Sequence, residues 1–126
     1  MPKVEVSFGE YFDKLSILEI KLSKITDGDK LLYIKEENNH LLSELGEYSY
    51  VLESDIYLKL NQLNSLIWDV EDAIREKEYN ESFDEEFIDL ARQVYKLNDE
   101  RFNCKSGINN LVGSSYKEQK SHKTCY

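Results

Sequence analysis

Residues 90–111 read LARQVYKLNDERFNCKSGINNL, and their spacing decides the fold class. One face recurs at intervals of four and three residues, which is the period of an α-helix and not the alternation of a strand. Similar spacing runs through most of the chain, and only one proline and five glycines interrupt its 126 residues. The sequence therefore predicts an all-α protein. The repeating face consists of Leu90, Val94, Leu97, Arg101, Cys104, Ile108 and Leu111.

Four helices account for the apolar spacing. The third and fourth are long, and the connection between them is only residues 79–81, so we expect an antiparallel hairpin. The first two helices would pack against this hairpin and complete an antiparallel four-helix bundle. The expected helices cover residues 7–25, 29–44, 51–78 and 82–112.

Capping patterns indicate where these helices begin and end. Ser7 is followed three residues later by Glu10, and Ser82 by Glu85, which is the capping-box pattern of a helix N-terminus. Gly113 is expected to end the fourth helix, because glycine is favoured just after a helix C-terminus. Residues 1–113 would then form a helical domain and residues 114–126 a polar tail.

The overall charge excludes several classes of function. The chain carries 25 acidic and 16 basic side chains, a formal net charge of −9. This excess disfavours binding to nucleic acid or to an anionic membrane, since both require clustered basic residues. No apolar run is long enough to span a membrane, and the first ten residues lack the order of a signal peptide, so we expect a cytoplasmic protein.

The fourth helix contains one conflict, because Arg101 occupies a position that apolar residues otherwise share. Its side chain should point inward, and Asn98, Lys105 and Asn109 fall within about a quarter turn of the same face. Buried polar groups must be paired, since burial without a partner costs several kcal/mol. A guanidinium and an ammonium suit phosphate or carboxylate, so the cluster is a candidate site for a small anion.

Partners for this cluster are expected on the other helices. The third helix carries a polar ridge of Asn64, Trp68, Glu71, Asp72 and Arg75 beside its apolar face. In an antiparallel hairpin Arg101 would lie level with about residue 62, which argues against a direct bridge to Asp72 and favours a carboxylate of the first helix. Glu19 lies next to the apolar stripe of that helix, and either Glu19 or Glu10 is expected to reach Arg101. Asp13 is expected outside the stripe.

Two interpretations of the polar cluster stay open. Buried Arg–carboxylate pairs can simply set the register of helices. Alternatively, the cluster holds a small anionic ligand or organises a contact with a protein partner.

The first helix has a second apolar side, at Ile17 and Ile20. A helix that is apolar on two sides is usually sandwiched between neighbours or used in a contact between subunits, so we expect a homo-oligomer.

The sequence leaves two other functions as alternatives to binding. Acidic residues three apart on facing helices could hold Mg²⁺, as in all-α nucleotide pyrophosphatases, although 25 acidic residues produce many such pairs by chance. A second alternative is an acidic decoy protein of a phage that mimics nucleic acid. If the protein is a binding protein and neither of these, we expect no catalytic residue, no metal and no cofactor. The residues of the magnesium alternative are Asp69, Asp72, Glu86 and Asp89.

Three segments of the chain resemble a known family. Residues 6–21, VSFGEYFDKLSILEIK, residues 66–75, LIWDVEDAIR, and a spaced pattern over residues 87–114 are similar to a family of small uncharacterised all-helical proteins. That family occurs in bacteria, often near genes for surface-polysaccharide or glycosyl transfer, and in marine phages. It has no assigned activity. The resemblance implies a helical binding or accessory protein with a link to surface-polysaccharide metabolism or to phage infection.

The resemblance also implies which residues form a shared site. Most of them coincide with the polar positions found by spacing, while Gly107 departs from the family's pattern. The residues implied are Asp13, Lys14, Glu19, Lys21, Trp68, Asp69, Glu71, Asp72, Arg75, Asn98, Asp99, Arg101 and Lys105.

Overall fold

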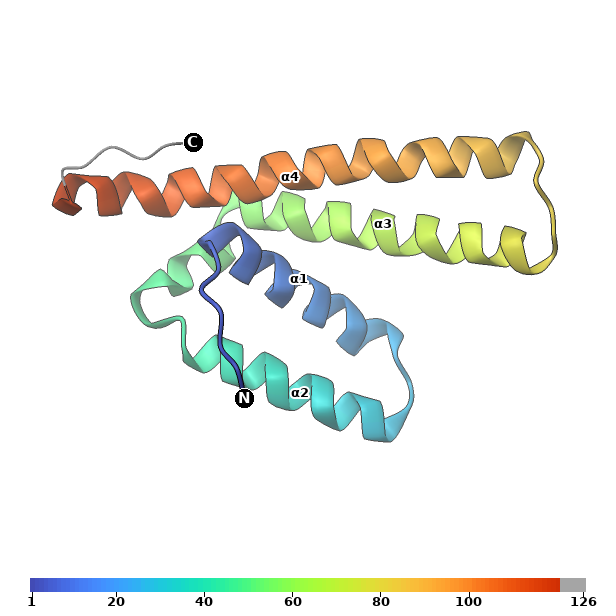
Figure 1. The fold of residues 1–126 in the computed structure, drawn as a ribbon. Helices are drawn as coiled ribbons and strands as arrows, with labels where there is room; N and C mark the ends of the chain where they lie inside the picture. The colour runs from blue at the N-terminus through green and yellow to red at the C-terminus, as the bar shows by residue number, and fades with distance from the viewer. Residues whose placement is uncertain (121–126) are drawn as a thin grey trace.

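The structure is a computed structural model that describes residues 1–120, with side chains described through residue 113. Within these residues all regular secondary structure is helical, as the sequence predicts, and it includes one 3₁₀ segment that the sequence analysis did not predict. Figure 1 shows the long antiparallel α3–α4 hairpin, with α1 packed against it and α2 on the far side of α1. The elements in chain order are α1 (Phe8–Lys24), α2 (Gly28–Ser43), η1 (Gly46–Glu53), α3 (Asp55–Tyr79) and α4 (Glu85–Lys120).

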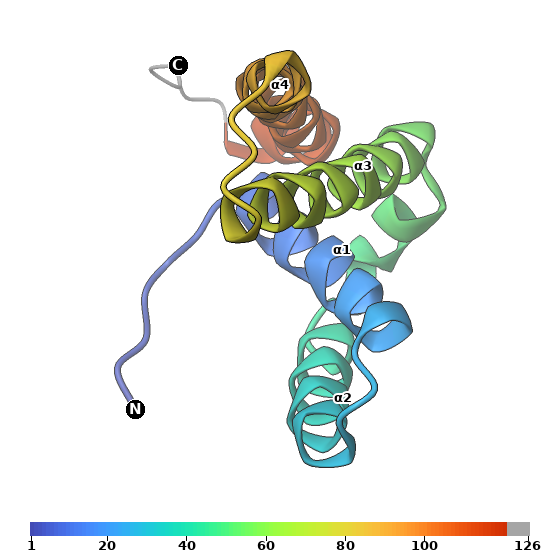
Figure 2. The same cartoon turned by 90° about the vertical axis from the view of Figure 1, so that its right-hand side faces the viewer.

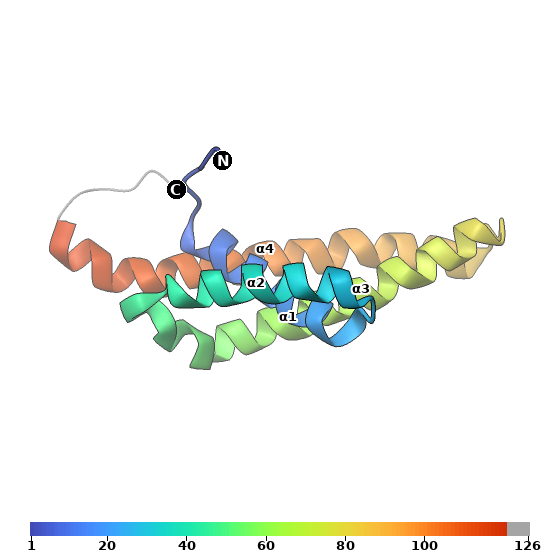
Figure 3. The same ribbon diagram turned by 90° about the horizontal axis from the view of Figure 1, so that it is seen from below.

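The four helices form a bundle in which α1 is central. Helix α1 packs against both α3 and α4, whereas α2 packs chiefly against α1. Figures 2 and 3 show the same arrangement from the end and from below, with α1 between α2 and the hairpin. None of the residues of α2 is buried, because α2 packs chiefly against one neighbour, α1.

The hydrophobic core lies where α1, η1 and the first half of α3 meet the second half of α4. Burial of these apolar side chains is the main stabilising contribution, at roughly 25 cal/mol per Å² removed from water. The buried cluster consists of Phe12, Leu15, Leu45, Val51, Tyr57, Leu60, Leu63, Cys104, Ile108 and Val112. Cys104 is thus a packing residue, and burial raises the pKa of its thiol.

Two expected helix starts were wrong. Residues 46–53 form a 3₁₀ segment that buries Val51, so α3 begins at Asp55, where the Ser54 hydroxyl accepts a hydrogen bond from the backbone N–H of Tyr57. Helix α4 begins after Asp84 and not after Ser82, because the Asp84 carboxylate accepts from the N–H of Phe87 at 2.9 Å. The start of α1 was predicted correctly, with Ser7 as its cap.

Helix α4 continues through Gly113 to Lys120. An interior glycine costs a helix only about 1 kcal/mol relative to alanine, which neighbouring turns can offset. The continued four-residue spacing buries Val112 in place of Leu111, which is exposed. Of the expected tail, residues 114–120 therefore belong to α4, and residues 121–126 lie outside the described residues.

None of the helices formed by residues 1–120 has the length and apolar character needed to cross a bilayer.

Gly9 is required for the close approach of α1 to α4. A Cβ atom at Gly9 would collide with the backbone carbonyl of Lys105, whereas one at Gly113 would meet no atom within 4 Å. We expect Gly9→Ala to lower the free energy of unfolding by about 1–3 kcal/mol, because α1 must shift. Gly113→Ala is the control and should raise stability by up to about 1 kcal/mol. Urea unfolding followed by circular dichroism measures both, and equal effects would contradict the close packing.

The cap of α4 predicts a dependence of stability on pH. The N–H of Phe87 and the ammonium of Lys77 hold the pKa of Asp84 below its ordinary value. The Asp84 carboxylate therefore stabilises the fold at pH values above about 4, and this contribution is lost as the pH falls through the lowered pKa. We expect Asp84→Ala to be less stable than the wild type at pH 7, with a difference that shrinks toward pH 2. A difference independent of pH in urea unfolding would contradict this assignment.

Candidate functional site

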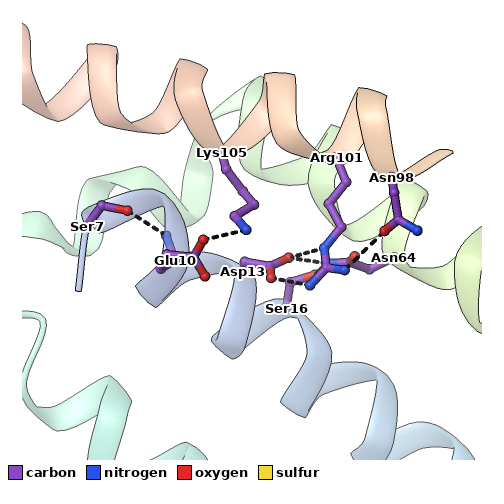
Figure 4. A network of polar contacts seen from close by, with 8 residues as sticks. All are labelled: Ser7, Glu10, Asp13, Ser16, Asn64, Asn98, Arg101 and Lys105. Atoms are coloured by element: carbon purple, nitrogen blue, oxygen red, sulfur yellow. Dashed lines mark hydrogen bonds and ion pairs between the residues drawn. The ribbon is translucent and has the colours of Figure 1, made fainter. Parts of the chain in front are cut away.

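The polar cluster of the fourth helix is organised around Asp13 of α1. The Arg101 Nε donates a hydrogen bond to Asp13 Oδ1 at 3.0 Å, and its NH2 donates to Asp13 Oδ2 (Figure 4). Asp13 is only 4% exposed, and the Arg101 side chain is 26% exposed. This bidentate geometry is the strongest form of carboxylate recognition by arginine. The hydrogen bonds to Asp13 raise the pKa of Arg101, so it remains a cation.

Two amides and a hydroxyl complete the network. Asn64 of α3 donates from Nδ2 to Asp13 Oδ1 and to the Ser16 hydroxyl, both at 3.0 Å. Arg101 NH1 donates to Asn98 Oδ1 at 3.3 Å. Asn98 in turn donates to the carbonyl of Val94. The network therefore joins α1, α3 and α4 through one buried carboxylate.

The sequence prediction identified the correct helix for this carboxylate but the wrong residue. Asp13 belongs to a 4-3-4 stripe with Gly9, Ser16 and Ile20, all of which are buried in α1. The presence of a glycine and a serine in register with Asp13 was a signal of close helix packing. The expectation that Asp13 lies outside the buried face overlooked this stripe.

Glu10 and Glu19 have other partners. The Glu10 carboxylate forms an ion pair with Lys105, one turn beyond Arg101 on α4. Glu19 remains exposed and lies beside Asn61 and Tyr57. Partial desolvation raises the pKa of the Glu19 carboxyl, while Asn61 and Tyr57 lower it. Glu19 is thus not part of the Arg101 cluster.

Asn109 also has a structural partner. Its Oδ1 accepts a hydrogen bond from the backbone N–H of Gly9 at 2.7 Å. This N–H belongs to the first turn of α1, where backbone donors have no partner within the helix. Asn109 and the Glu10–Lys105 pair therefore fasten the start of α1 to α4. The side chains of Asn98, Lys105 and Asn109 are each engaged within the chain, and none of them lines the cavity described next.

A cavity of about 180 Å³ lies between α1 and α3, beside the buried network. Arg101 and Asn64 line it, together with apolar walls from both helices. The structure brings Trp68, Glu71, Asp72 and Arg75 to the same cavity, so the polar ridge expected on the third helix does meet Arg101 at one site. The complete lining is Ile17, Ile20, Asn64, Ile67, Trp68, Glu71, Asp72, Arg75 and Arg101. Ile17 and Ile20 therefore face α3, and α1 is sandwiched between its neighbours.

The two innermost polar groups keep unused hydrogen-bonding capacity. Asn64 is 4% exposed, and its Oδ1 accepts no hydrogen bond from any described residue. Arg101 uses three of its five N–H groups on Asp13 and Asn98. Farther out, the Arg75 guanidinium lies 3.6 Å from the Glu71 carboxylate. Beside the network, Asn64 thus keeps one free acceptor and Arg101 two free N–H groups, and the charged groups of Glu71, Asp72 and Arg75 line the cavity as well.

The four carboxylates of the magnesium alternative do not gather at one point. Asp69 pairs with Lys24 at 3.6 Å, and Glu86 pairs with Lys77 at 3.1 Å near the hairpin tip. Among the described residues, no three His, Cys, Asp or Glu side chains are close enough together to hold one metal ion. The geometry therefore lends this alternative no support.

The Asp13–Arg101 pair predicts strong energetic coupling. Arg101→Met leaves a buried carboxylate without its cation and should lower the free energy of unfolding by about 3 kcal/mol or more. The double variant Asp13→Leu/Arg101→Met should cost less than the sum of the two single variants, with a coupling energy of about 1–3 kcal/mol. Urea unfolding provides these values, and Lys96→Met, an exposed cation on the same helix, is the control. Additive effects of the two single changes would show that the pair is not coupled.

Comparisons with known proteins agree with the resemblance found in the sequence. No curated protein and no solved structure matches the chain. A family model described as a family of unknown function, DUF6165, matches residues 2–126. Because this match covers almost the whole chain, the protein belongs to the DUF6165 family.

Proposed function

We propose that this protein binds a small organic molecule in the cavity between α1 and α3. The observation that carries the proposal is the make-up of the cavity, in which three isoleucines and one tryptophan adjoin two polar groups, Asn64 and Arg101, that keep free hydrogen-bonding atoms, and three charged side chains complete the lining. Small-molecule sites are typically of this kind, mostly apolar with a few fixed polar groups. The buried network holds Arg101 and Asn64 in place, so a ligand would not have to order them.

The charges around the cavity favour a neutral ligand over a phosphate. Asp13 neutralises Arg101, and Glu71 lies opposite Arg75, which leaves Asp72 as the unbalanced charge. A phosphate dianion would therefore meet more negative than positive charge. The charge balance of the cavity therefore disfavours the small anionic ligand that the sequence suggested. The residues expected to bind that anion, Asn98 and Lys105, support the fold in the present proposal.

A hydroxyl group matches the two free polar groups. It can donate to Asn64 Oδ1 and accept from an Arg101 N–H at the same time. The indole of Trp68 and the three isoleucines supply an apolar surface for the body of the ligand. We therefore propose a small ring compound that carries hydroxyl groups, such as a sugar or a sugar derivative. The link to surface-polysaccharide metabolism that the family resemblance implies is compatible with such a ligand and stays a prediction.

We propose binding without catalysis and without a cofactor. The strongest potential nucleophile among the described residues is the Cys104 thiol, which is buried in the core and has a raised pKa, so its reactive thiolate is disfavoured. The basic groups near the cavity are held by carboxylates, as described above.

The single tryptophan of the chain provides the test. Trp68 lines the cavity, so a bound ligand should change its fluorescence. We expect free hexoses or N-acetylhexosamines to change this fluorescence and to raise the melting temperature, since a ligand at ten times its Kd adds about 1.4 kcal/mol. Inorganic phosphate is the anionic probe and should have no effect.

Two variants separate binding at the cavity from binding elsewhere. Trp68→Leu should abolish the thermal shift, and Leu66→Ala, an exposed apolar position on the same helix, should retain it. A response to phosphate and not to the sugars would show that the site binds an anion, and it would contradict the proposed neutral ligand. A thermal shift that survives Trp68→Leu would place the ligand outside the cavity and contradict the proposal.

A further inference from the structure

The outer surface of α4 carries a regular apolar stripe that the bundle does not use. Ile88, Tyr95 and Phe102 are spaced by seven residues and are 54%, 54% and 65% exposed. Seven residues are close to two helical turns, so the three side chains lie in one nearly straight row about 21 Å long. This row is separate from the inner face of α4, where Cys104, Ile108 and Val112 are buried, and none of its members lines the cavity.

A row of this kind is unusual for an exposed helix surface. Single exposed apolar side chains are common, but large ones repeated at the heptad interval fill one of the two positions, a and d, whose apolar residues form the contact line of a helix pair. Ala91, which lies three residues after Ile88 and four before Tyr95, leaves room for a second helix to approach. The next position of the repeat, seven residues after Phe102, is Asn109. Its side chain accepts a hydrogen bond from the Gly9 N–H, so the apolar row ends at Phe102. The stripe is therefore a defined surface with room for one partner helix.

We propose that this stripe binds the same stripe of a second copy of the chain, with the two α4 helices antiparallel about a two-fold axis. The axis would pass beside Tyr95, so that Tyr95 meets the partner's Tyr95. In this register Ile88 packs against the partner's Phe102, and Phe102 packs against the partner's Ile88. Such a contact is self-complementary, as two-fold symmetry requires.

The flanking charges select this partner and this direction. Arg92 lies four residues after Ile88, and Asp99 lies four residues after Tyr95, so both flank the stripe on the same side. Both are exposed, and neither forms an ion pair with any residue for which the structure describes a side chain. Antiparallel packing about Tyr95 places Arg92 beside the partner's Asp99, and Asp99 beside the partner's Arg92. In a parallel pair the charged sides of the two helices would lie on opposite sides of the contact, so Arg92 could not reach the partner's Asp99.

The contact is independent of the proposed ligand. Its residues lie on the outside of α4, while the ligand cavity lies between α1 and α3. Loss of ligand binding by Trp68→Leu should therefore leave association unchanged, and disruption of the stripe should leave the Trp68 fluorescence response unchanged. Failure of either proposal can then be told from failure of the other.

Sedimentation of the purified full chain tests the association. From micromolar to millimolar concentration at low salt, we expect the average mass to rise from 14.9 kDa toward twice that value. Tyr95→Glu and Phe102→Glu should each weaken association by about tenfold or more, because they bury a charge in the contact. Leu58→Glu and Leu66→Glu are matched controls, since these residues of α3 are equally exposed, at 57% and 51%.

Charge exchange tests the direction of the two helices. Arg92→Asp and Asp99→Arg should each weaken association by about threefold, and the double exchange should restore it.

Disulfide formation between engineered cysteines tests the register. A Tyr95→Cys variant in a Cys125→Ser background should form a disulfide with a second copy of itself under mild oxidation. In the same background, Ile88→Cys should form a disulfide only when it is mixed with Phe102→Cys.

Three outcomes would overturn the proposal. A wild-type chain that stays monomeric over this range at low salt has no such contact. A dimer that Tyr95→Glu and Phe102→Glu leave intact is built by another surface. A stripe that binds a different protein while the chain alone stays monomeric would assign the surface to that partner.

Discussion

One buried carboxylate, that of Asp13, sets the arrangement of the helices. An unpaired charge in the interior costs several kcal/mol, so α1 can pack against the hairpin only where Arg101 and Asn64 reach this group. These two partners come from different helices. A single residue therefore fixes the position of α1 relative to both α3 and α4. The absence of a Cβ at Gly9, one turn earlier, allows the close approach that the hydrogen bonds need.

The same network prepares the cavity. Because Asp13 holds Arg101 through Nε and NH2, the guanidinium cannot turn freely, and its remaining N–H groups have a fixed orientation. Asn64 is likewise held by its amide nitrogen, which leaves its carbonyl oxygen free. A site that is ordered before its ligand arrives binds at a lower entropic cost. The buried pair thus orients the polar groups of the proposed site. A structural role and a binding role of the Arg101 cluster are therefore not exclusive.

The helix boundaries show the limits of local sequence signals. Ser82 and Asp84 are both acceptable caps for α4, and the choice depends on the turn before them, where Glu81 adopts a left-handed conformation with φ of 53°. Nothing in the spacing of the serines predicts that turn. Gly113 is a normal helix end by sequence, yet α4 continues, since the cost of an interior glycine is small beside the burial of Val112. Where local preferences for a helix boundary differ by only about 1 kcal/mol, tertiary packing decides where the helix begins or ends.

The sequence alone determined the helical class, the hairpin, the inward position of Arg101 and the need for an acid from the first helix, because each follows from the period of one helix and the cost of burying charge. Only the tertiary structure decided that this acid is Asp13 and that Trp68 faces the same cavity. Glu10, Asp13 and Glu19 lie within three turns of one another, and which of them points at α4 depends on the rotation of α1 about its own axis. That rotation results from all the contacts of α1 with α2, α3 and α4 together, and no single segment of sequence contains it.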